Sequence, residues 1–231
     1  NVLVNKSGDD LVAWCWKAGG LPTINTDGSI KSLVSANQAA GFSIVGFTGT
    51  GSAGSIGHGL SSAPELIILK NLDGTNSWAV QQTELGNGYL LLNSTAAYSS
   101  TAFWGTPTAS VFNITSNNSG TILNNEHIAY CFTSIPNYQK IGSYEGDTND
   151  VFVSTGFQPS FVLVKNVDAS VSNWTLWDDK RGGTNFLQPN NSGAEASGRT
   201  VTFDALGFTV DTNGGTNSNS NGDTFIYLAI K

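Results

Sequence analysis

The stretch PELIILKNLDGTNSW, residues 64–78, returns 95 residues later as PSFVLVKNVDASVSNW, residues 159–174. Both copies place a proline ahead of four apolar residues, which Lys-Asn, an aspartate and a tryptophan then follow. Unbroken apolar runs of this length are typical of strands that are covered on both faces. A proline before such a strand removes no hydrogen-bond donor from the ladder. We therefore interpret LIIL and FVLV as central strands of two related units.

The similarity extends from the quoted stretch through most of both halves of the chain. Two aligned pairs, both at an offset of 96 residues, are Gly46 with Gly142 and Phe112 with Phe208. Solenoid and propeller repeats are only about 20 to 50 residues long. The sequence therefore predicts a tandem duplication in which each copy is the size of a domain.

The composition predicts an all-β protein. Charged residues make up 12% of the 231 residues, about half of the usual fraction of roughly 25%. Ser, Thr, Asn and Gly supply the remaining polarity, and these residues favour caps and turns over helix interiors. Apolar and aromatic runs recur every 8 to 12 residues or so, as in sandwiches and barrels. We predict two tandem, duplicated antiparallel β-sandwich units of the jelly-roll type.

The predicted strands follow the same order in the two copies. In the first copy they are 43–48, 65–71, 77–82, 89–93, 110–115 and 127–133, and in the second 139–144, 160–166, 173–178, 185–188, 207–211 and 224–230.

The repeats divide the chain into four segments. NKSGDDLVAWCWK, residues 5–17, aligns without a gap with NSNGDTFIYLAIK, residues 219–231. Residues 1–18 are therefore interpreted as the closing strand or hairpin of a preceding β-sandwich. Residues 19–41 are interpreted as a linker or arm, either a helical turn or an extended segment. The first repeat is predicted to span 42–135 and the second 136–231.

The charge balance argues against two classes of partner. The formal net charge is −7, and Lys180-Arg181 is the densest basic pair, so the basic surface that nucleic-acid binding needs is missing. No apolar run approaches the ~18 to 20 residues of a membrane span. We expect neither nucleic-acid binding nor membrane insertion. Cys15 and Cys131 lie in apolar runs without metal-type spacing, which predicts two buried free thiols in preference to the alternative, a disulfide.

Few residues have the spacing of a catalytic or metal site, and we predict no catalytic residue, metal or cofactor. His58 and His127 lack a Gly-x-Ser-x-Gly partner motif. The glycine-rich run 46–57 lacks the Lys-Ser/Thr ending of a phosphate loop and is interpreted as a hairpin. The oxygen-rich run 211–223 lacks the terminal Glu of an EF-hand and is interpreted as a solvated loop.

WDDKR, residues 177–181, is the densest charge cluster, and Glu195 follows it. Asp178, Asp179 and Glu195 could form a carboxylate pair of the glycosidase type. Alternating acids and bases at the end of a strand more simply indicate mutual ion pairs, and we prefer that interpretation.

Tryptophans offer stacking surfaces for sugars. Trp78 and Trp174 recur at equivalent positions, which indicates core packing or an anchor between units. Trp104, in TAFWGTP, has no aligned counterpart, so it is our candidate for an exposed ligand-binding residue. Recognition is expected in loops that differ between the copies, such as 101–107 and 178–195.

The chain resembles a family of domains of unknown function found in tail-fibre and other virion proteins of marine bacteriophages. The resemblance rests on DGSIKSLVSANQAAGFSIVGFTGTGSAGSIGHGLSSAPELIILKN (27–71), YLLLNSTAAYSSTAFWGTPTASVFNI, YQKIGSYEGD, NWTLWDDKR and FIYLAI, which occur in this order. In such proteins the unit commonly follows a concanavalin-like or SPRY-like domain whose end is similar to GDDLVAWCWKAGG (8–20). The resemblance implies a structural role in the particle and brings no catalytic residues with it.

We therefore expect the C-terminal part of a virion structural protein, in a tail fibre, appendage or capsid surface, that mediates assembly and host-surface adhesion. The expected partners are other virion subunits, further copies of the chain, for which a trimer is one arrangement, and host surface glycans. One alternative is a dedicated carbohydrate-binding, lectin-like module. The third hypothesis is a polysaccharide depolymerase that uses Asp178, Asp179 or Glu195.

Overall fold

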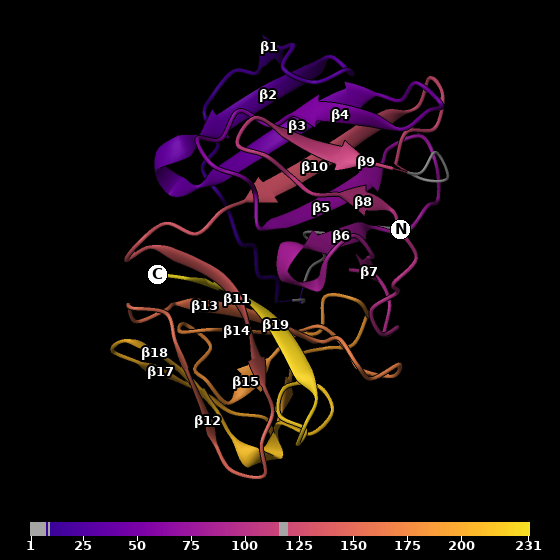
Figure 1. The fold of residues 1–231 in the computed structure, drawn as a ribbon. Helices are drawn as coiled ribbons and strands as arrows, with labels where there is room; N and C mark the ends of the chain where they lie inside the picture. The colour runs from indigo at the N-terminus through magenta and orange to yellow at the C-terminus, as the bar shows by residue number, and fades with distance from the viewer. Residues whose placement is uncertain (1–7, 9, 116–119) are drawn as a thin grey trace.

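The computed structural model describes residues 8, 10–115 and 120–231. Within these residues the chain forms nineteen strands and three single-turn 3-10 helices, and no α-helix. Figure 1 shows two β-rich units stacked on one another, the first in indigo to magenta and the second in orange to yellow. The predicted all-β class is confirmed. No helix in the described ranges is long and apolar enough to cross a membrane.

The first unit is a sandwich of two antiparallel sheets. Its elements are β1 (Thr23–Asn25), β2 (Ser32–Asn37), η1 (Gln38–Ala40), β3 (Phe42–Thr48), β4 (Gly54–Gly57), β5 (Leu66–Asn71), β6 (Ala79–Gln82), η2 (Thr83–Leu85), β7 (Leu90–Leu91), β8 (Trp104–Gly105), β9 (Val111–Ile114) and β10 (Glu126–Phe132). The large sheet has the order β1-β2-β3-β10-β5-β6-β7 and the outer sheet β4-β9-β8. The glycine-rich run 46–57 thus joins two different sheets, and its interpretation as a hairpin is wrong.

The second unit is built in the same way. Its elements are β11 (Gln139–Glu145), β12 (Val151–Ser154), β13 (Phe161–Asn166), β14 (Thr175–Asp178), β15 (Asn185–Phe186), β16 (Ala196–Ser197), β17 (Val201–Asp204), β18 (Gly207–Val210), η3 (Thr212–Gly214) and β19 (Thr224–Ile230). The large sheet has the order β11-β19-β13-β14, the outer sheet β12-β18-β17, and β15 pairs with β16.

The duplication is visible in the sheet topology. The order β3-β10-β5-β6 returns as β11-β19-β13-β14, and β4-β9-β8 returns as β12-β18-β17. The register corrects one aligned pair: Gly46 lies opposite Ile128, whereas Ser143 lies opposite Ile226. Gly46 therefore corresponds to Ser143, not to Gly142. A shift of one residue matters in a strand because it exchanges the two faces.

The apolar run of β5 is buried on both faces. Ile67 and Leu69 face the core between the two sheets of the first unit, while Leu66 and Ile68 face the second unit. This division follows from the pleat, which points successive side chains to opposite sides. The structure confirms that this strand is covered on both faces.

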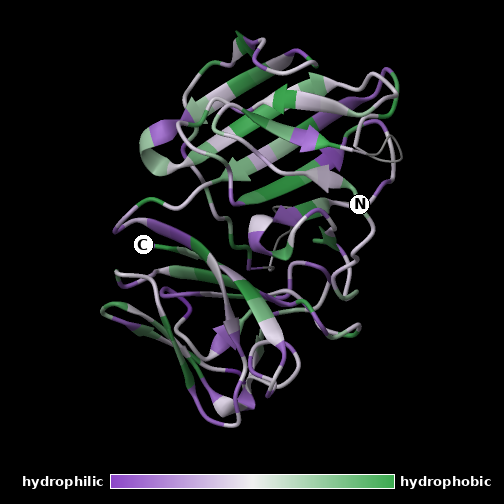
Figure 2. Ribbon diagram, viewed as in Figure 1, coloured by the Kyte–Doolittle hydropathy of each residue, from purple (hydrophilic) through white to green (hydrophobic). Residues whose placement is uncertain are grey.

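The apolar run of β13 mirrors that arrangement. Val162 and Val164 lie in the core of the second unit, and Phe161 and Leu163 face the first unit. The chain is therefore a stack of four layers, with the two large sheets face to face at its centre. Figure 2 shows hydrophobic segments along the central strands of both units.

Hydrogen bonds also cross between the units. Trp174 is 2% exposed, and its Nε1 donates to the carbonyl of Leu91 in the first unit at 2.9 Å. The Tyr98 amide donates to the carbonyl of Val167 at 2.8 Å. Trp174 is thus an anchor between the units.

Residues 19–41 add strands to the first unit. Strand β2 pairs with β3 along its whole length, with Leu33 opposite Gly46, and β1 extends the sheet by three pairs. One 3-10 turn, η1, then leads into β3. The sequence left open whether this segment is extended or a helical turn. The structure shows that it contains both.

Residues 10–18 run as an extended segment without assigned strand pairing. Side chains alternate along it, so that Trp14 and Trp16 pack into the layer between the units while Cys15 is exposed. The prediction of a buried thiol is wrong for Cys15 because it lies on the outward side of this alternation. Cys131 is buried and free, and burial raises the pKa of its thiol to about 12. Residues 1–7 of the expected closing hairpin lie outside the described residues.

The layer between the units is expected to carry much of the stability. Ile226 is 2% exposed within it, so Ile226→Ala should lower the free energy of unfolding by about 2 to 5 kcal/mol. The control Leu33→Ala, at a side chain that is 51% exposed, should change it by about 0.5 kcal/mol or less. Denaturant unfolding followed by tryptophan fluorescence and circular dichroism measures both. Separate transitions, with only the second unit destabilised, would contradict a shared core.

Candidate functional site

Trp104, the predicted ligand-binding residue, is fully buried. It lies on β8 opposite Ile114, and its ring contacts the ring of Phe103, with the ring centroids 4.9 Å apart. The second unit places Val201 opposite Val210 at the equivalent position. The prediction of an exposed indole is wrong, because the side chain faces inward from β8. Its counterpart in the second unit also faces inward, and sequence alignment alone did not find this pair.

The repeated lysine binds the turn after each central strand. Lys70 follows the apolar run of β5, and its Nζ donates to the carbonyls of Asn71, Gly74 and Asn76 at 2.8, 2.9 and 2.8 Å. Three carbonyls satisfy the three donors of an ammonium group. The lysine therefore closes its own hairpin loop.

Lys165 does the same in the second unit and also reaches the first. Its Nζ donates to the carbonyls of Asn166 at 2.7 Å, Ser172 at 3.0 Å and Thr95 at 3.4 Å. Burial lowers the pKa of Lys165 to about 8. The carbonyl of Thr95 belongs to the first unit, so this ammonium connects the two repeats.

The asparagine and aspartate that follow complete the same turn. Asn71 Oδ1 accepts from the Asp73 amide at 2.9 Å, which forms an Asx turn. Asp73 Oδ2 in turn accepts from the amide of Glu126 at the start of β10, at 2.6 Å. Asp168 accepts from the amide of Thr224 at the start of β19, also at 2.6 Å. The Lys-Asn-x-Asp motif therefore builds structure in both copies.

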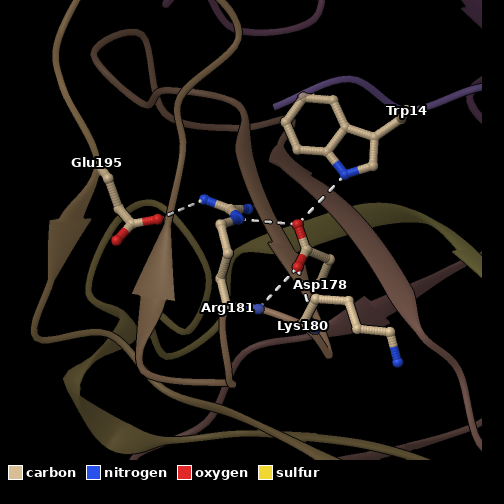
Figure 3. Close-up of polar contacts among 5 residues, drawn as sticks. All are labelled: Trp14, Asp178, Lys180, Arg181 and Glu195. Atoms are coloured by element: carbon tan, nitrogen blue, oxygen red, sulfur yellow. Dashed lines mark hydrogen bonds and ion pairs between the residues drawn. The ribbon is translucent and has the colours of Figure 1, made fainter. Parts of the chain in front are cut away.

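The charge cluster WDDKR lies where β14 ends, and Figure 3 shows its contacts. Asp178 Oδ1 accepts from the amides of Lys180 and Arg181 at 3.2 and 3.0 Å. Asp178 Oδ2 accepts from Arg181 Nε at 2.8 Å and from Trp14 Nε1 at 3.3 Å. Arg181 Nη1 reaches Glu195 Oε2 at 3.1 Å. The cluster therefore ties the segment 10–18 to the second unit.

The charges of this cluster suit structure better than acid catalysis. Burial favours the neutral acid of Asp178, but hydrogen bonds and attraction from Arg181 outweigh burial and hold the pKa of that carboxyl below its usual value. A glycosidase general acid needs the opposite, a raised pKa. Asp179 pairs with the exposed Lys180 at 3.0 Å, and Glu195 pairs with Arg181. This arrangement agrees with the preferred interpretation of mutual ion pairs.

Both histidines are buried in packing roles. His58 Nδ1 accepts from the Leu60 amide at 3.1 Å, so Nε2 carries the proton that bonds the Thr108 carbonyl at 3.1 Å. Burial lowers the pKa of His58, which favours the neutral ring. The His127 ring stacks on Phe47, with centroids 5.1 Å apart.

The oxygen-rich run 211–223 agrees only in part with its interpretation as a solvated loop: residues 212–213, 215–216 and 221–222 are exposed, whereas 214 and 217–219 are buried. Asn217 Oδ1 accepts from the Asn173 amide at 2.6 Å, and the Ser218 carbonyl accepts from the Tyr144 hydroxyl at 2.6 Å. Side-chain amides and carbonyls of the loop thus bond to protein partners. Within the described residues, no group of three or more His, Cys, Asp or Glu side chains is arranged to hold a metal ion.

An exposed aromatic residue that the sequence analysis did not select lies on the outer sheet of the second unit. Phe152 is 55% exposed on β12 and lies opposite Thr209 of β18. A Cβ on Gly207 would lie 3.0 Å from the Phe152 ring, so the ring covers this glycine. Asp204 accepts from the Thr209 hydroxyl beside it, at 2.6 Å. The alternation of β12 points Phe152 outward, but no sequence signal distinguishes the two faces of so short a strand.

Fold and contacts together define an all-β protein of two stacked sandwiches whose repeated polar motifs hold turns. The chain belongs to the family described as a domain of unknown function, DUF7483, whose family model matches residues 1–231. No curated protein and no solved structure matches the chain. The expected membership in a family of unknown function is confirmed, and the phage origin stays a prediction.

The ion pair between Arg181 and Asp178 is expected to contribute stability, since the two side chains are only 15% and 10% exposed. Arg181→Gln should lower the free energy of unfolding by about 1 to 3 kcal/mol, because it leaves a buried charge without its partner. Lys180→Gln, at a side chain 87% exposed, should change it by about 0.5 kcal/mol or less. Urea unfolding of both variants gives the comparison, and equal effects would contradict the assignment.

The stability that the Arg181–Asp178 ion pair contributes should depend on pH. The folded-state pKa of Asp178 is lowered, so its contribution is present above the ordinary value of about 3.9 and is lost as the pH falls below it. The difference in stability between wild type and Arg181→Gln should therefore shrink in acid.

Proposed function

We propose that this chain is a structural component of a bacteriophage virion, in a tail fibre, an appendage or the capsid surface, where it mediates assembly and host-surface adhesion. The observation that carries the proposal is the four-layer stack, in which the repeated motifs of both copies hold turns and interfaces. A four-layer stack of this kind suits a protein whose role depends on a stable shape. The resemblance to virion proteins supplies the location.

Contacts with further copies or with other virion subunits are part of the proposal. Ile24 and Leu33 lie opposite one another on β1 and β2 and are 66% and 51% exposed, with Leu21 nearby in sequence at 92%. Exposed apolar side chains on an edge pair favour association. They support an oligomer, for which a trimer is one arrangement.

The proposal is tested on particles produced by the genome that encodes this chain. Antibodies raised against residues 19–231 should label a fibre, appendage or capsid surface in electron micrographs, and quantitative mass spectrometry should give several copies per particle. The isolated chain should also reduce adsorption of the particles to host cells. Absence of the chain from purified particles would overturn the proposal.

A carbohydrate-binding function is the second candidate, and Phe152 now favours it in place of Trp104. An exposed ring beside hydroxyl and carboxylate groups can stack on a sugar ring and accept its hydroxyl bonds. Thr209 and Asp204 supply those groups on the same outer sheet.

A glycan array with the isolated chain tests this second function. If the outer sheet is a sugar site, saturable binding should weaken about tenfold or more in Phe152→Ala, which corresponds to a loss of about 1.4 kcal/mol. Tyr138→Ala, at another exposed aromatic side chain, is the control and should bind as wild type does. Binding that survives Phe152→Ala would place the sugar elsewhere.

A further inference from the structure

An apolar cavity of about 460 Å³, partly open to solvent, lies in the layer between the two units. Its wall combines Trp14 and Trp16 from the segment 10–18, Trp78 and Leu92 from the first unit, and Leu163 from the second, among other apolar side chains. Concave apolar pockets are where small ligands usually bind. A space of this size against the main interface is therefore a candidate ligand site.

We propose that this cavity binds a small aromatic compound. Its volume falls within the range of roughly 300 to 1,000 Å³ that ligand pockets occupy. An apolar guest is favoured in such a cavity, because it removes apolar wall surface from water. The proposal goes beyond the virion function and does not depend on it.

The rings around the cavity favour an aromatic guest over an aliphatic one. Trp16 packs edge-on against Phe132 and Phe161, with centroids 6.2 and 5.6 Å apart, and Trp14 packs edge-on against Phe161 at 6.2 Å. Edge-to-face pairs are worth about 0.5 to 1.5 kcal/mol beyond the area that they bury. A flat guest between the sheets can extend this set of ring contacts.

The segment 10–18 forms one wall of the cavity without belonging to a sheet. Its polar contacts are Trp14 Nε1 to Asp178 at 3.3 Å, the Arg181 guanidinium 5.6 Å from the Trp14 ring centroid, and Asn37 Nδ2 to the Lys17 carbonyl at 3.0 Å. Its two tryptophans also pack against the layer between the units. Because the cavity is partly open to solvent, a guest can enter while the segment keeps these contacts.

Naphthalene is the test probe, and isothermal titration calorimetry with the full chain is the measurement. We expect saturable binding of one molecule per chain. Methyl resonances of Leu163, which lines the cavity, should shift on binding, while those of Leu69, which faces the other core, should not.

Three matched variants locate the site. Leu163→Trp and Leu92→Trp place an indole in the cavity and should each weaken binding at least tenfold, the second from a half-buried position. Leu72→Trp makes the same change at a side chain that is 58% exposed and does not line the cavity, so it should bind naphthalene as wild type does. If Leu163→Trp fails to fold, Leu92→Trp and the methyl shifts decide.

The proposal is overturned by an absence of saturable binding up to the solubility limit of naphthalene, or by binding that both cavity variants retain. It is also overturned if a second copy of the chain covers the cavity. In that case sedimentation gives the mass of a dimer, and adding naphthalene changes neither that mass nor the methyl spectrum of the chain.

Discussion

The apolar contact between the two large sheets is the constraint on which the rest of the structure depends. It requires both sheets to be apolar on two faces, which explains why LIIL and FVLV are unbroken runs. It also places the polar ends of these strands, Lys70-Asn71 and Lys165-Asn166, at the border of this apolar layer. Charged and amide groups there need internal partners, and the carbonyls and amides of their own turns supply them.

The two repeats are related in sequence but are not independent in space. Lys165 bonds the carbonyl of Thr95, and Trp174 bonds the carbonyl of Leu91, so the second unit uses main-chain groups of the first. Each unit has one core of its own and one face that is covered by the other unit together with Trp14 and Trp16 of the segment 10–18. A single repeat alone would expose that face to water, at a cost of about 25 cal/mol for each Å² of apolar surface.

The sequence predicted the twelve repeated strands and the all-β class well, because both follow from local alternation and from comparison of the copies. It did not predict the seven strands that are two to six residues long and become strands through pairing with neighbours, namely β1, β2, β4, β8, β12, β16 and β17. Burial of Trp104 was missed because its strand, β8, was not predicted and because its counterpart Val201, although also apolar, is a much smaller residue. The inward folding of part of 211–223 depends on partners such as Asn166 and Asn173, which are distant in sequence, and no local pattern encodes those bonds.

The turn that follows each central strand also marks the repeat unit of the chain. Its lysine and aspartate bond main-chain atoms, which every residue possesses, whereas its asparagine also bonds a side chain, that of Asn76 in the first copy and of Asp223 in the second. Most neighbouring side chains are therefore free to change while the turn persists. A proline, four apolar residues and Lys-Asn-x-Asp therefore form a signature of one sandwich unit. In longer chains of this family, the number of such signatures should equal the number of sandwiches. An odd number would leave one large sheet without an opposite sheet, and that face would be the place to look for another protein.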